Sequence, residues 1–396
     1  MKHFGWSMDG VKWWPSGITS QAYENPPFND LVTSFGKLTT WDFADVFTID
    51  WWLNQPTEGV VYGDWPKPDK VSRFHEDRCG IVVELANNCY GRIIPFGVGN
   101  DLSRLLNHQP WREALDGCPI VLPSSVWTVD GHDRIAIYHT ELITDFDIWT
   151  DVFEMAEKLG KIHSSLEQFA TPNTERRWND RLAEIESALK TNTLWRAPHS
   201  KYTVGLPRLN FDYELYAKIE GSAYFLATSR TVQEHLLCSP DRLPALSNLM
   251  ILERQIARKN PSKALDREKF LGSWLSSSPF SYRRKKALST LLGGPWIWRY
   301  HAVLLELAEA QVYGDKAMKK AANNWLTDVS RIQAHLGVLR LWKSGLWAGI
   351  SGIAVGFFGW KISSFSQTTG LIVGITGLAV AIACNAIYWA KDPDPY

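Results

Sequence analysis

Three kinds of feature that often reveal a function are missing from this sequence of 396 residues. Basic and acidic residues balance at 42 each, so no excess of charge attracts the chain to nucleic acid. The five cysteines form no CxxC pair, and the ten histidines show neither HxxxH nor HxH spacing. Because the ligands of metal sites usually occur at such spacings, we expect no metal site. The balanced charge likewise leads us to expect no nucleic-acid partner.

The cysteines are few, odd in number and dispersed along the chain (Cys79, Cys89, Cys118, Cys238 and Cys384). Cys384 falls inside a long apolar segment, away from the other four. Such a set is typical of a reducing compartment. The N-terminal "MKHFGWSMDG" has one lysine but reaches Asp9 before any apolar run, so we expect no secretory signal.

Charge is also absent from most of the C-terminal segment, residues 341–396. No charged residue occurs in 344–360 or in 362–390, which are runs of 17 and 29 residues. A helix needs about 20 apolar residues, within a range of about 17 to 25, to cross the hydrocarbon core. Lys361, between the two runs, can reach the interface on its long stem, and the polar segment 363–370 can form a turn. These features predict a C-terminal transmembrane hairpin with two spans.

Two further patterns favour a membrane over the alternative, a helical hairpin buried in a soluble core. Aromatic side chains stand at the ends of both runs, as in the aromatic belts of membrane proteins: Trp342, Trp347, Trp360, Tyr388 and Trp389. Small residues recur at four-residue spacing, which lets helix backbones approach closely in lipid: Gly345, Gly349, Gly352, Gly356, Gly370 and Gly374. We expect these glycines to pack helices, either within the hairpin or between copies in a homo-oligomer.

The charges that flank the hairpin predict its orientation. Between Lys316 and Lys343 the chain carries six basic residues and a single acidic one, Asp328. Positively charged flanks stay on the cytoplasmic side of a membrane. We therefore expect a multi-pass protein whose N-terminal head and C-terminus are cytosolic and whose partner is membrane lipid.

The patterns in the head predict an α+β or α/β fold with a helical second half. Residues 1–75 are irregular, aromatic-rich and rich in proline, whereas residues 76–230 mix strands and helices and residues 231–340 are helical. Strand-like runs occupy 80–86, 91–99, 118–129 and 134–142, with a hairpin turn at "VDGHD", and helical periodicity occupies 151–169 and 176–190. The twenty tryptophans are more typical of packing anchors than of stacking platforms for a ligand.

The string "IIPFGVGNDLSRLL" (93–106) runs from a strand through a glycine turn into a helix. Backbone amides in such a turn, together with the helix N-terminus, can bind an anion. The string resembles the GTGND nucleotide loop of diacylglycerol-kinase-type lipid kinases at Gly97, Gly99, Asn100 and Asp101. That resemblance implies a membrane-tethered phosphotransferase that uses ATP and Mg²⁺ on a lipid. The family's GGDGT loop corresponds to "DRCGIVVELAN", where Cys79 stands in place of the motif's aspartate. The alternative is a strand-to-helix turn with an Asn or Asp cap.

A second resemblance leads to a different fold. "DGHDRIAIYHTEL" (130–142) followed by "EMAEKLGKIHSSL" (154–166) resembles the hinge strand and following helix of aminoglycoside-phosphotransferase-like kinases. No HxDxxxxN segment occurs in 166–260, so the aspartate base and the metal-binding asparagine of those kinases are both missing. This resemblance implies a kinase-like scaffold without catalysis, and at most one of the two resemblances can hold.

A basic cluster in "SSSPFSYRRKK" (276–286) lies beside aromatic residues and includes Arg283, Arg284, Lys285 and Lys286. It predicts either contact with anionic lipid headgroups or a solvated helix start. Three functions remain open. In the first, a membrane-anchored head binds a ligand or partner at the membrane face without evident catalysis. The second is the lipid-kinase-like phosphotransferase, and the third is a membrane-perturbing effector whose hairpin oligomerises.

Overall fold

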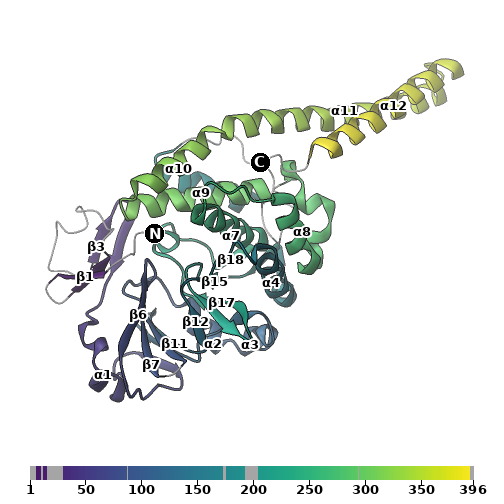
Figure 1. The fold of residues 1–396 in the computed structure, drawn as a ribbon. Coiled ribbons are helices and arrows are strands. Elements are labelled where there is room, and N and C mark those ends of the chain that lie inside the picture. Colours follow the sequence, from purple (N-terminus) through teal and green to yellow (C-terminus); the bar gives the residue numbers. More distant parts are fainter. Residues whose placement is uncertain are drawn as a thin grey trace.

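The computed structural model describes residues 6–9, 12–15, 30–86, 88–172, 175–191, 204–292 and 294–392. It shows a compact α+β head from which two long helices project side by side (Figure 1). The predicted α+β class of the head is therefore confirmed.

The first half of the head is built on a six-stranded antiparallel sheet in the order β5-β10-β11-β8-β7-β6. Its strands are β5 (Val60–Gly63), β6 (Ser72–Asp77), β7 (Gly80–Ala86), β8 (Cys89–Ile93), β10 (Ser125–Val129) and β11 (His132–His139). The predicted turn joins β10 to β11, with positive φ at Asp130 (51°) and Gly131 (74°). Strands β5 and β6 show that the sheet begins before residue 76. Helices α2 (Asp101–Asn107) and α3 (Gln109–Leu115) follow β8.

A second sheet lies beside the first and has the order β12-β16-β17-β15, with β9 parallel to β17. Its strands are β9 (Ile120–Val121), β12 (Glu141–Ile143), β15 (Asn210–Phe211), β16 (Tyr216–Ile219) and β17 (Ser222–Thr228). A small sheet joins β13 (Thr171–Pro172), β14 (Val204–Pro207) and β18 (Arg242–Pro244). Because β11 belongs to the first sheet and β12 to the second, the segment 132–143 connects the two.

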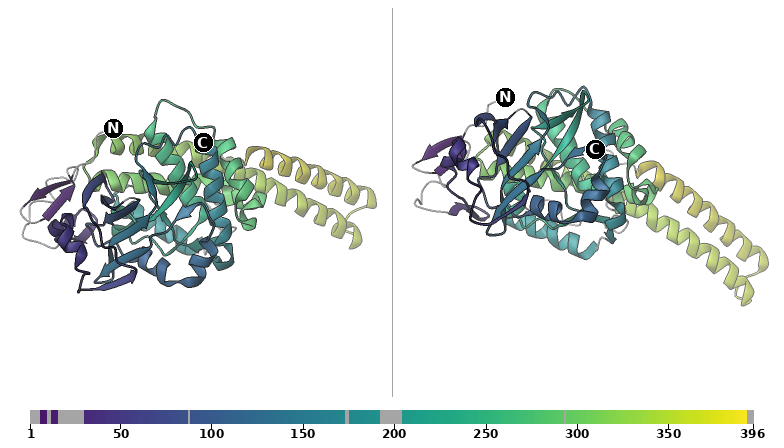
Figure 2. Two further views of the ribbon diagram at one scale, coloured as in Figure 1. Left: turned by 60° about the horizontal axis from the view of Figure 1, so that its bottom comes forward. Right: turned by 90° about the horizontal axis from the view of Figure 1, so that it is seen from below.

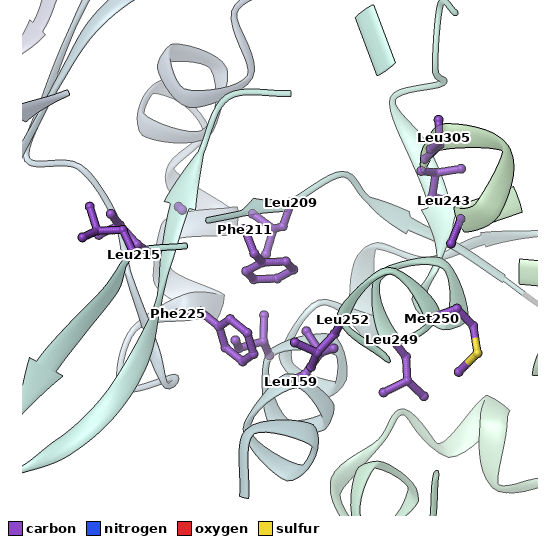
Figure 3. Close-up of a cluster of buried hydrophobic side chains, with 14 of the residues drawn as sticks. Leu159, Leu209, Phe211, Leu215, Phe225, Leu243, Leu249, Met250, Leu252 and Leu305 are labelled. Carbon is purple, nitrogen blue, oxygen red and sulfur yellow. The ribbon is translucent and has the colours of Figure 1, made fainter. Parts of the chain in front are cut away.

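Helices pack against the second sheet and form the rest of the head. They are α4 (Val152–Ser165), α5 (Glu175–Ala188), α6 (Val232–Leu236), α7 (Ala245–Lys259), α8 (Arg267–Ser277), α9 (Pro295–Val312) and α10 (Lys316–Thr327). Figure 3 shows part of the apolar core, where Leu159 of α4 and Leu252 of α7 lie close to Phe225 of β17. Each fully buried side chain of this size contributes about 1.5–3 kcal/mol. Helix α9 is buried along almost its whole length, so it is the central helix of the head.

The remaining described elements are short: most lie near the N-terminus, one follows α4, and three lie in the segment 280–292. They are β1 (Trp6–Asp9), β2 (Lys12–Pro15), β3 (Asp30–Thr33), β4 (Gly36–Thr39), η2 (Ala44–Phe47), α1 (Ile49–Leu53), η3 (Glu167–Phe169), η4 (Phe280–Arg283), η5 (Lys285–Leu288) and η6 (Thr290–Leu292). Several tryptophans pack here around α1. Trp52 and Trp65 stack at 5.2 Å, and the Trp52 indole N–H donates to the Val46 carbonyl at 2.7 Å. These contacts agree with tryptophan as a packing anchor.

Helices α11 (Val329–Lys361) and α12 (Gln367–Lys391) form the projecting pair. The first third of α11 packs on the head, where Ile332, Leu336 and Leu339 are buried, and the rest leaves it (Figures 1 and 2). Most of the exposed large apolar side chains among the described residues lie on this pair, including Trp347, Val355, Phe358, Leu371, Ile375 and Ile382. The hairpin is therefore not buried in a soluble core, because its apolar surface faces outward.

The two helices differ in their capacity to cross a membrane. Among the described helices, one is long and apolar enough, Gln367–Lys391. Helix α11 is not, because its uncharged part covers only the 17 residues 344–360, and five of these are glycines that lower its mean hydropathy. Of the two predicted spans, α12 thus has the length and composition that a membrane crossing requires, and α11 does not.

Candidate functional site

The base of the helix pair is tied to the head by polar side chains. The Ser289 hydroxyl lies 3.0 Å from the Tyr388 hydroxyl and donates to the Asp392 carboxylate at 3.0 Å. On α11, His335 Nε2 lies 2.9 Å from the carbonyl oxygen of Lys391. At the same end, Trp342 and Trp389 pack against the core of the head. Trp342 and Trp389, which were expected in a membrane belt, therefore contact the protein at the base of the pair. Trp347, farther along α11, is 61% exposed.

The glycines of the hairpin face the opposite helix of the same chain. A Cβ placed on Gly349 would lie 2.6 Å from the Ala381 backbone nitrogen, and one on Gly356 would lie 2.6 Å from the Gly370 carbonyl oxygen. The Cys384 thiol fills the space beside Gly345. Gly352 likewise faces α12, since a Cβ placed on it would lie 3.3 Å from the Gly377 Cα. By contrast, no described atom lies within 4 Å of a Cβ on Gly374. Gly345, Gly349, Gly352, Gly356 and Gly370 thus lie close to the other helix of the same chain, whereas the Cβ position of Gly374 is open.

The basic cluster of η4 and η5 lies close to the base of the pair, since Ser289 follows it directly. Phe280 is 66% exposed, and the Arg284 guanidinium lies over its ring at 5.9 Å. Arg283 donates from Nε to the Ser278 carbonyl at 3.1 Å. Lys286 is exposed, and the side chain of Lys285 lies outside the described part of the chain. The structure therefore places exposed positive charge and an exposed aromatic ring together on the segment 280–286, which we call the shoulder of the head.

The backbone amides of Gly97, Gly99 and Leu102 already have partners within the protein. The Gly97 N–H donates to the Thr39 carbonyl at 2.8 Å, and the Gly99 N–H donates to His132 Nδ1 at 2.9 Å. At the N-terminus of α2, the Leu102 N–H donates to the Asp133 carboxylate at 2.8 Å. This carboxylate occupies the place that a ligand anion would take. Strand β8, which precedes the loop, has antiparallel neighbours on both sides.

The side chains of the loop are also engaged. Asp101 is buried and accepts from Arg230 at 2.8 and 2.9 Å and from Asn210 at 3.0 Å. Burial opposes ionisation of Asp101, but its hydrogen bonds and charge interactions with Arg230 hold its pKa below the usual range. Asn100 is the N-cap residue of α2 by position, although its side chain makes no cap hydrogen bond. These contacts support a structural role for the loop.

A large cavity lies elsewhere, between the first sheet and the helical part of the head. Its volume is about 910 Å³. The lining comes from the β6–β7 turn, the segment after β15, the segment between β17 and α6, the end of α7 and the junction of α9 with α10. Cavities of about 300–1,000 Å³ hold small molecules in many proteins. The geometry therefore places the strongest candidate site of the head here.

A buried arginine joins the two sheets at the wall of this cavity. Arg92 of β8 donates two parallel hydrogen bonds to the Asp77 carboxylate, both 2.8 Å long, and also pairs with Asp212. Burial opposes ionisation of Asp77, but Arg92 outweighs it, so the pKa of this carboxyl lies well below its usual range. The two carboxylates therefore share one guanidinium.

A second arginine closes one end of the cavity. Arg78, in the turn between β6 and β7, pairs with Glu309 of α9 and with Asp315 at 2.8 Å. The Tyr313 hydroxyl donates to the Arg78 carbonyl at 3.1 Å. Burial disfavours the charged guanidinium, but Glu309 and Asp315 hold the pKa of Arg78 above its usual value. We call these contacts the Arg78 clamp, since they hold the hairpin turn against the α9–α10 junction.

Two cations from the last turn of α7 line the same cavity. Arg258 lies 3.4 Å from Glu309, so this carboxylate is shared by two arginines. Lys259 lies over the Tyr216 ring at 5.6 Å and, among the described residues, has no carboxylate within ion-pair distance. Burial lowers the pKa of Lys259 from its usual value. The sequence offered no motif for this group, because its members come from distant segments.

No family model matches this chain, and the search of curated proteins finds no match. Among the described residues, no group of three or more His, Cys, Asp and Glu side chains is arranged to hold a metal ion. The segment quoted for the second resemblance does form a strand of the first sheet, a connection to the second and then helix α4.

Proposed function

We propose that this protein is a membrane-anchored binding protein, whose helix pair lies in a bilayer and whose head binds a ligand without evident catalysis. The observation that carries the proposal is the outward apolar surface of α12, a helix long enough to cross a membrane. Leu371, Ile375 and Ile382 are each about 60% exposed on it. An apolar surface of this extent marks a site that is covered in the functional state, and a bilayer covers it on every side.

Close packing of the two helices supports insertion of α11 together with α12. Because Gly349 and Gly356 bring the backbones into contact, α12 cannot enter lipid while the facing part of α11 stays in water. Lys361, at the far end, can extend its ammonium group to the interface. The basic residues before Lys343 favour a cytosolic head and C-terminus. This gives a two-span topology with the turn near Ser366 on the other side.

The shoulder that carries Phe280 supports contact between the head and lipid headgroups. It joins the hairpin base through Ser289, so it lies next to the membrane surface when the pair is inserted. An exposed ring can enter the interface while Arg284 and Lys286 meet anionic headgroups, each charge contributing about 1 kcal/mol.

Binding rather than group transfer fits the cavity. Its two most buried carboxylates, Asp77 and Asp212, both pair with the Arg92 guanidinium, and the pKa of Asp77 lies below its usual range. The sequence between 166 and 260 also lacks the catalytic segment of the kinases that its hinge strand resembles.

Labelling with a membrane-impermeant maleimide tests the anchoring and its orientation. In a background with the exposed Cys238 replaced by serine, Ser366→Cys should react in intact cells, and Ser276→Cys should react only after permeabilisation. The protein should also stay with membranes after alkaline extraction. Labelling of Ser276→Cys alone in intact cells would reverse the orientation, and recovery of the chain in the soluble fraction would refute the anchoring.

A further inference from the structure

We infer that the cavity of the head binds a water-soluble organic anion, whose phosphate or carboxylate group replaces Glu309 and Asp315 at Arg78 and Arg258. The inference rests on the proposed function in one respect, since it names the class of ligand that the head binds. Three observations support it. Three cations lie at one end of the cavity, carboxylates of the protein pair with two of them, and this end lies away from the base of the helix pair.

The three cations come from two separate elements and converge on the cavity. Arg78 is at the β6–β7 turn, and Arg258 and Lys259 are in the last turn of α7. Such a group attracts an anion strongly in a site partly shielded from water. Lys259 has a ring contact and no described carboxylate within ion-pair distance, and Glu214 of the same lining interacts with it only at longer range, so a ligand anion can approach its ammonium group.

Two carboxylates of the protein occupy the arginines in this structure. Glu309 pairs with Arg78 and Arg258 and accepts from Gln233 Nε2 at 3.3 Å, and Asp315 pairs with Arg78. A guanidinium binds carboxylate and phosphate groups through the same planar fork, so a ligand anion can take either place. Once displaced, Asp315 still accepts from the Met318 N–H at 2.9 Å as the cap of α10. The exchange therefore leaves that carboxylate with a partner.

The rest of the cavity suits an apolar body attached to the anion. Phe74, Phe211, Tyr213 and Val232 contribute to its lining. With a volume of about 910 Å³, the cavity is larger than an inorganic phosphate or a carboxylate alone requires. This combination favours an organic anion with an aromatic or aliphatic portion.

The position of the clamp favours a dissolved ligand over a lipid headgroup. Helix α9 begins beside the hairpin base and ends at the Arg78 clamp. Its 18 residues span about 27 Å, at 1.5 Å per residue. With the helix pair in a bilayer, the cationic end of the cavity therefore lies well away from the headgroups.

Titration of the full-length chain in detergent micelles with phenyl phosphate tests the inference by calorimetry. We expect saturable binding that is about tenfold tighter in Glu309→Gln, which removes a competing carboxylate, and about tenfold weaker in Lys259→Met. Lys259 contributes no ion pair to the described fold, so its variant keeps the test valid if Glu309→Gln unfolds. Glu306→Gln is the matched control: it lies one turn earlier on α9 and pairs with Arg254, outside the large cavity. We expect its affinity to be unchanged.

The inference is overturned if phenyl phosphate binds neither the wild-type chain nor Glu309→Gln. It is also overturned if Glu306→Gln changes the affinity as much as Glu309→Gln does. Repeating the titration in nanodiscs with and without phosphatidate separates the two sources of anion. Unchanged affinity supports a dissolved ligand, whereas competition by phosphatidate would assign the cavity to a lipid headgroup and overturn the proposal. Membrane extraction tests the proposed anchoring, and the titration tests the ligand. Either can fail without the other, because the chain is titrated in micelles whether or not it inserts into membranes in cells.

Discussion

The hydroxyl group of Tyr388, near the end of α12, lies 3.0 Å from the hydroxyl group of Ser289 in the head. The same serine donates to Asp392, and Thr290 donates to the Asp392 carbonyl. The last turn of the projecting pair is therefore part of the folded head. This contact explains how a hairpin with an outward apolar surface keeps a defined direction relative to the head.

Removal of this hydroxyl should weaken the connection without altering the apolar packing. We expect Tyr388→Phe to lower the free energy of unfolding by about 1 kcal/mol, the typical contribution of one buried hydrogen bond. Denaturant unfolding of the full chain in micelles measures the change. Tyr90→Phe is the control, because the Tyr90 hydroxyl has no described hydrogen bond and its loss should change little. An equal effect in both variants would contradict the role of the contact.

A charge in the outward surface of α12 should interfere with insertion. Ile375 is 59% exposed in the middle of the helix, and Ile375→Lys would place an ammonium group near the bilayer centre at a cost of about 2.5–3.5 kcal/mol. We expect a marked fall in the fraction that resists alkaline extraction. Ile219→Lys, on the surface of the head, should leave that fraction unchanged. Full retention of Ile375→Lys in membranes would show that this face of α12 does not lie in lipid.

The glycine contacts should be required for the pairing of α11 with α12. Gly349→Leu would place a side chain against the backbone of Ala381, whereas Gly374→Leu would enter open space. Oxidative crosslinking of Gly345→Cys to the native Cys384 reports the pairing, since the two positions face each other. We expect Gly349→Leu to abolish this crosslink and Gly374→Leu to preserve it. Loss in Gly374→Leu alone would mean that the glycines pack between copies instead.

Asp133 should make the stability of the head depend on pH. Burial raises the pKa of this carboxyl to about 6, whereas an aspartate in an unfolded chain titrates near 3.9. Between these two values the folded state binds more protons, so this group contributes a fall in stability as pH rises from about 4 to 6. A shift of this size corresponds to about 3 kcal/mol as an upper bound. We expect Asp133→Asn to flatten the dependence in unfolding measurements across that window, and an unchanged slope would contradict the assignment.

Asp101 distinguishes a structural loop from a nucleotide loop. If Asp101 acted only as a helix cap, Asp101→Asn would be nearly silent, but Asp101 is buried and forms an ion pair with the partly exposed Arg230, which changes this expectation. Loss of one partner of a buried pair costs about 3–5 kcal/mol, and less here because Arg230 also pairs with Asp241. Thermal unfolding should therefore show clear destabilisation. An unchanged melting temperature together with loss of an ATP-dependent activity would return the loop to a catalytic role.

Local patterns were sufficient to predict many elements of this fold. The run at 80–86 is strand β7, the turn at 129–133 joins β10 to β11, and the periodic segments at 151–169 and 176–190 contain α4 and α5. The absence of charge in 362–390 likewise marks α12. Each of these features depends on neighbouring residues, whose spacing along the chain is also their spacing in the element.

The candidate site could not be found in this way, because its contacts join residues far apart in the sequence. Arg78 and Glu309 are 231 positions apart, and Arg92 and Asp212 are 120 apart. The cap of α2 comes from Asp133 on a neighbouring strand rather than from Asn100 beside the helix. An arginine in a turn has many potential partners, and only the packing of the sheets against α9 decides which carboxylates it meets.

For this protein, the sequence alone determined where apolar segments end and where strands and helices form, because those preferences act over a few residues. The tertiary structure decided that Gly349 and Gly356 lie against the other helix of the hairpin, that the amides of Gly99 and Leu102 have internal partners, and that three cations face one cavity. These outcomes depend on backbone approach and burial, which raise the energetic cost of an unpaired polar group and are set by the whole fold.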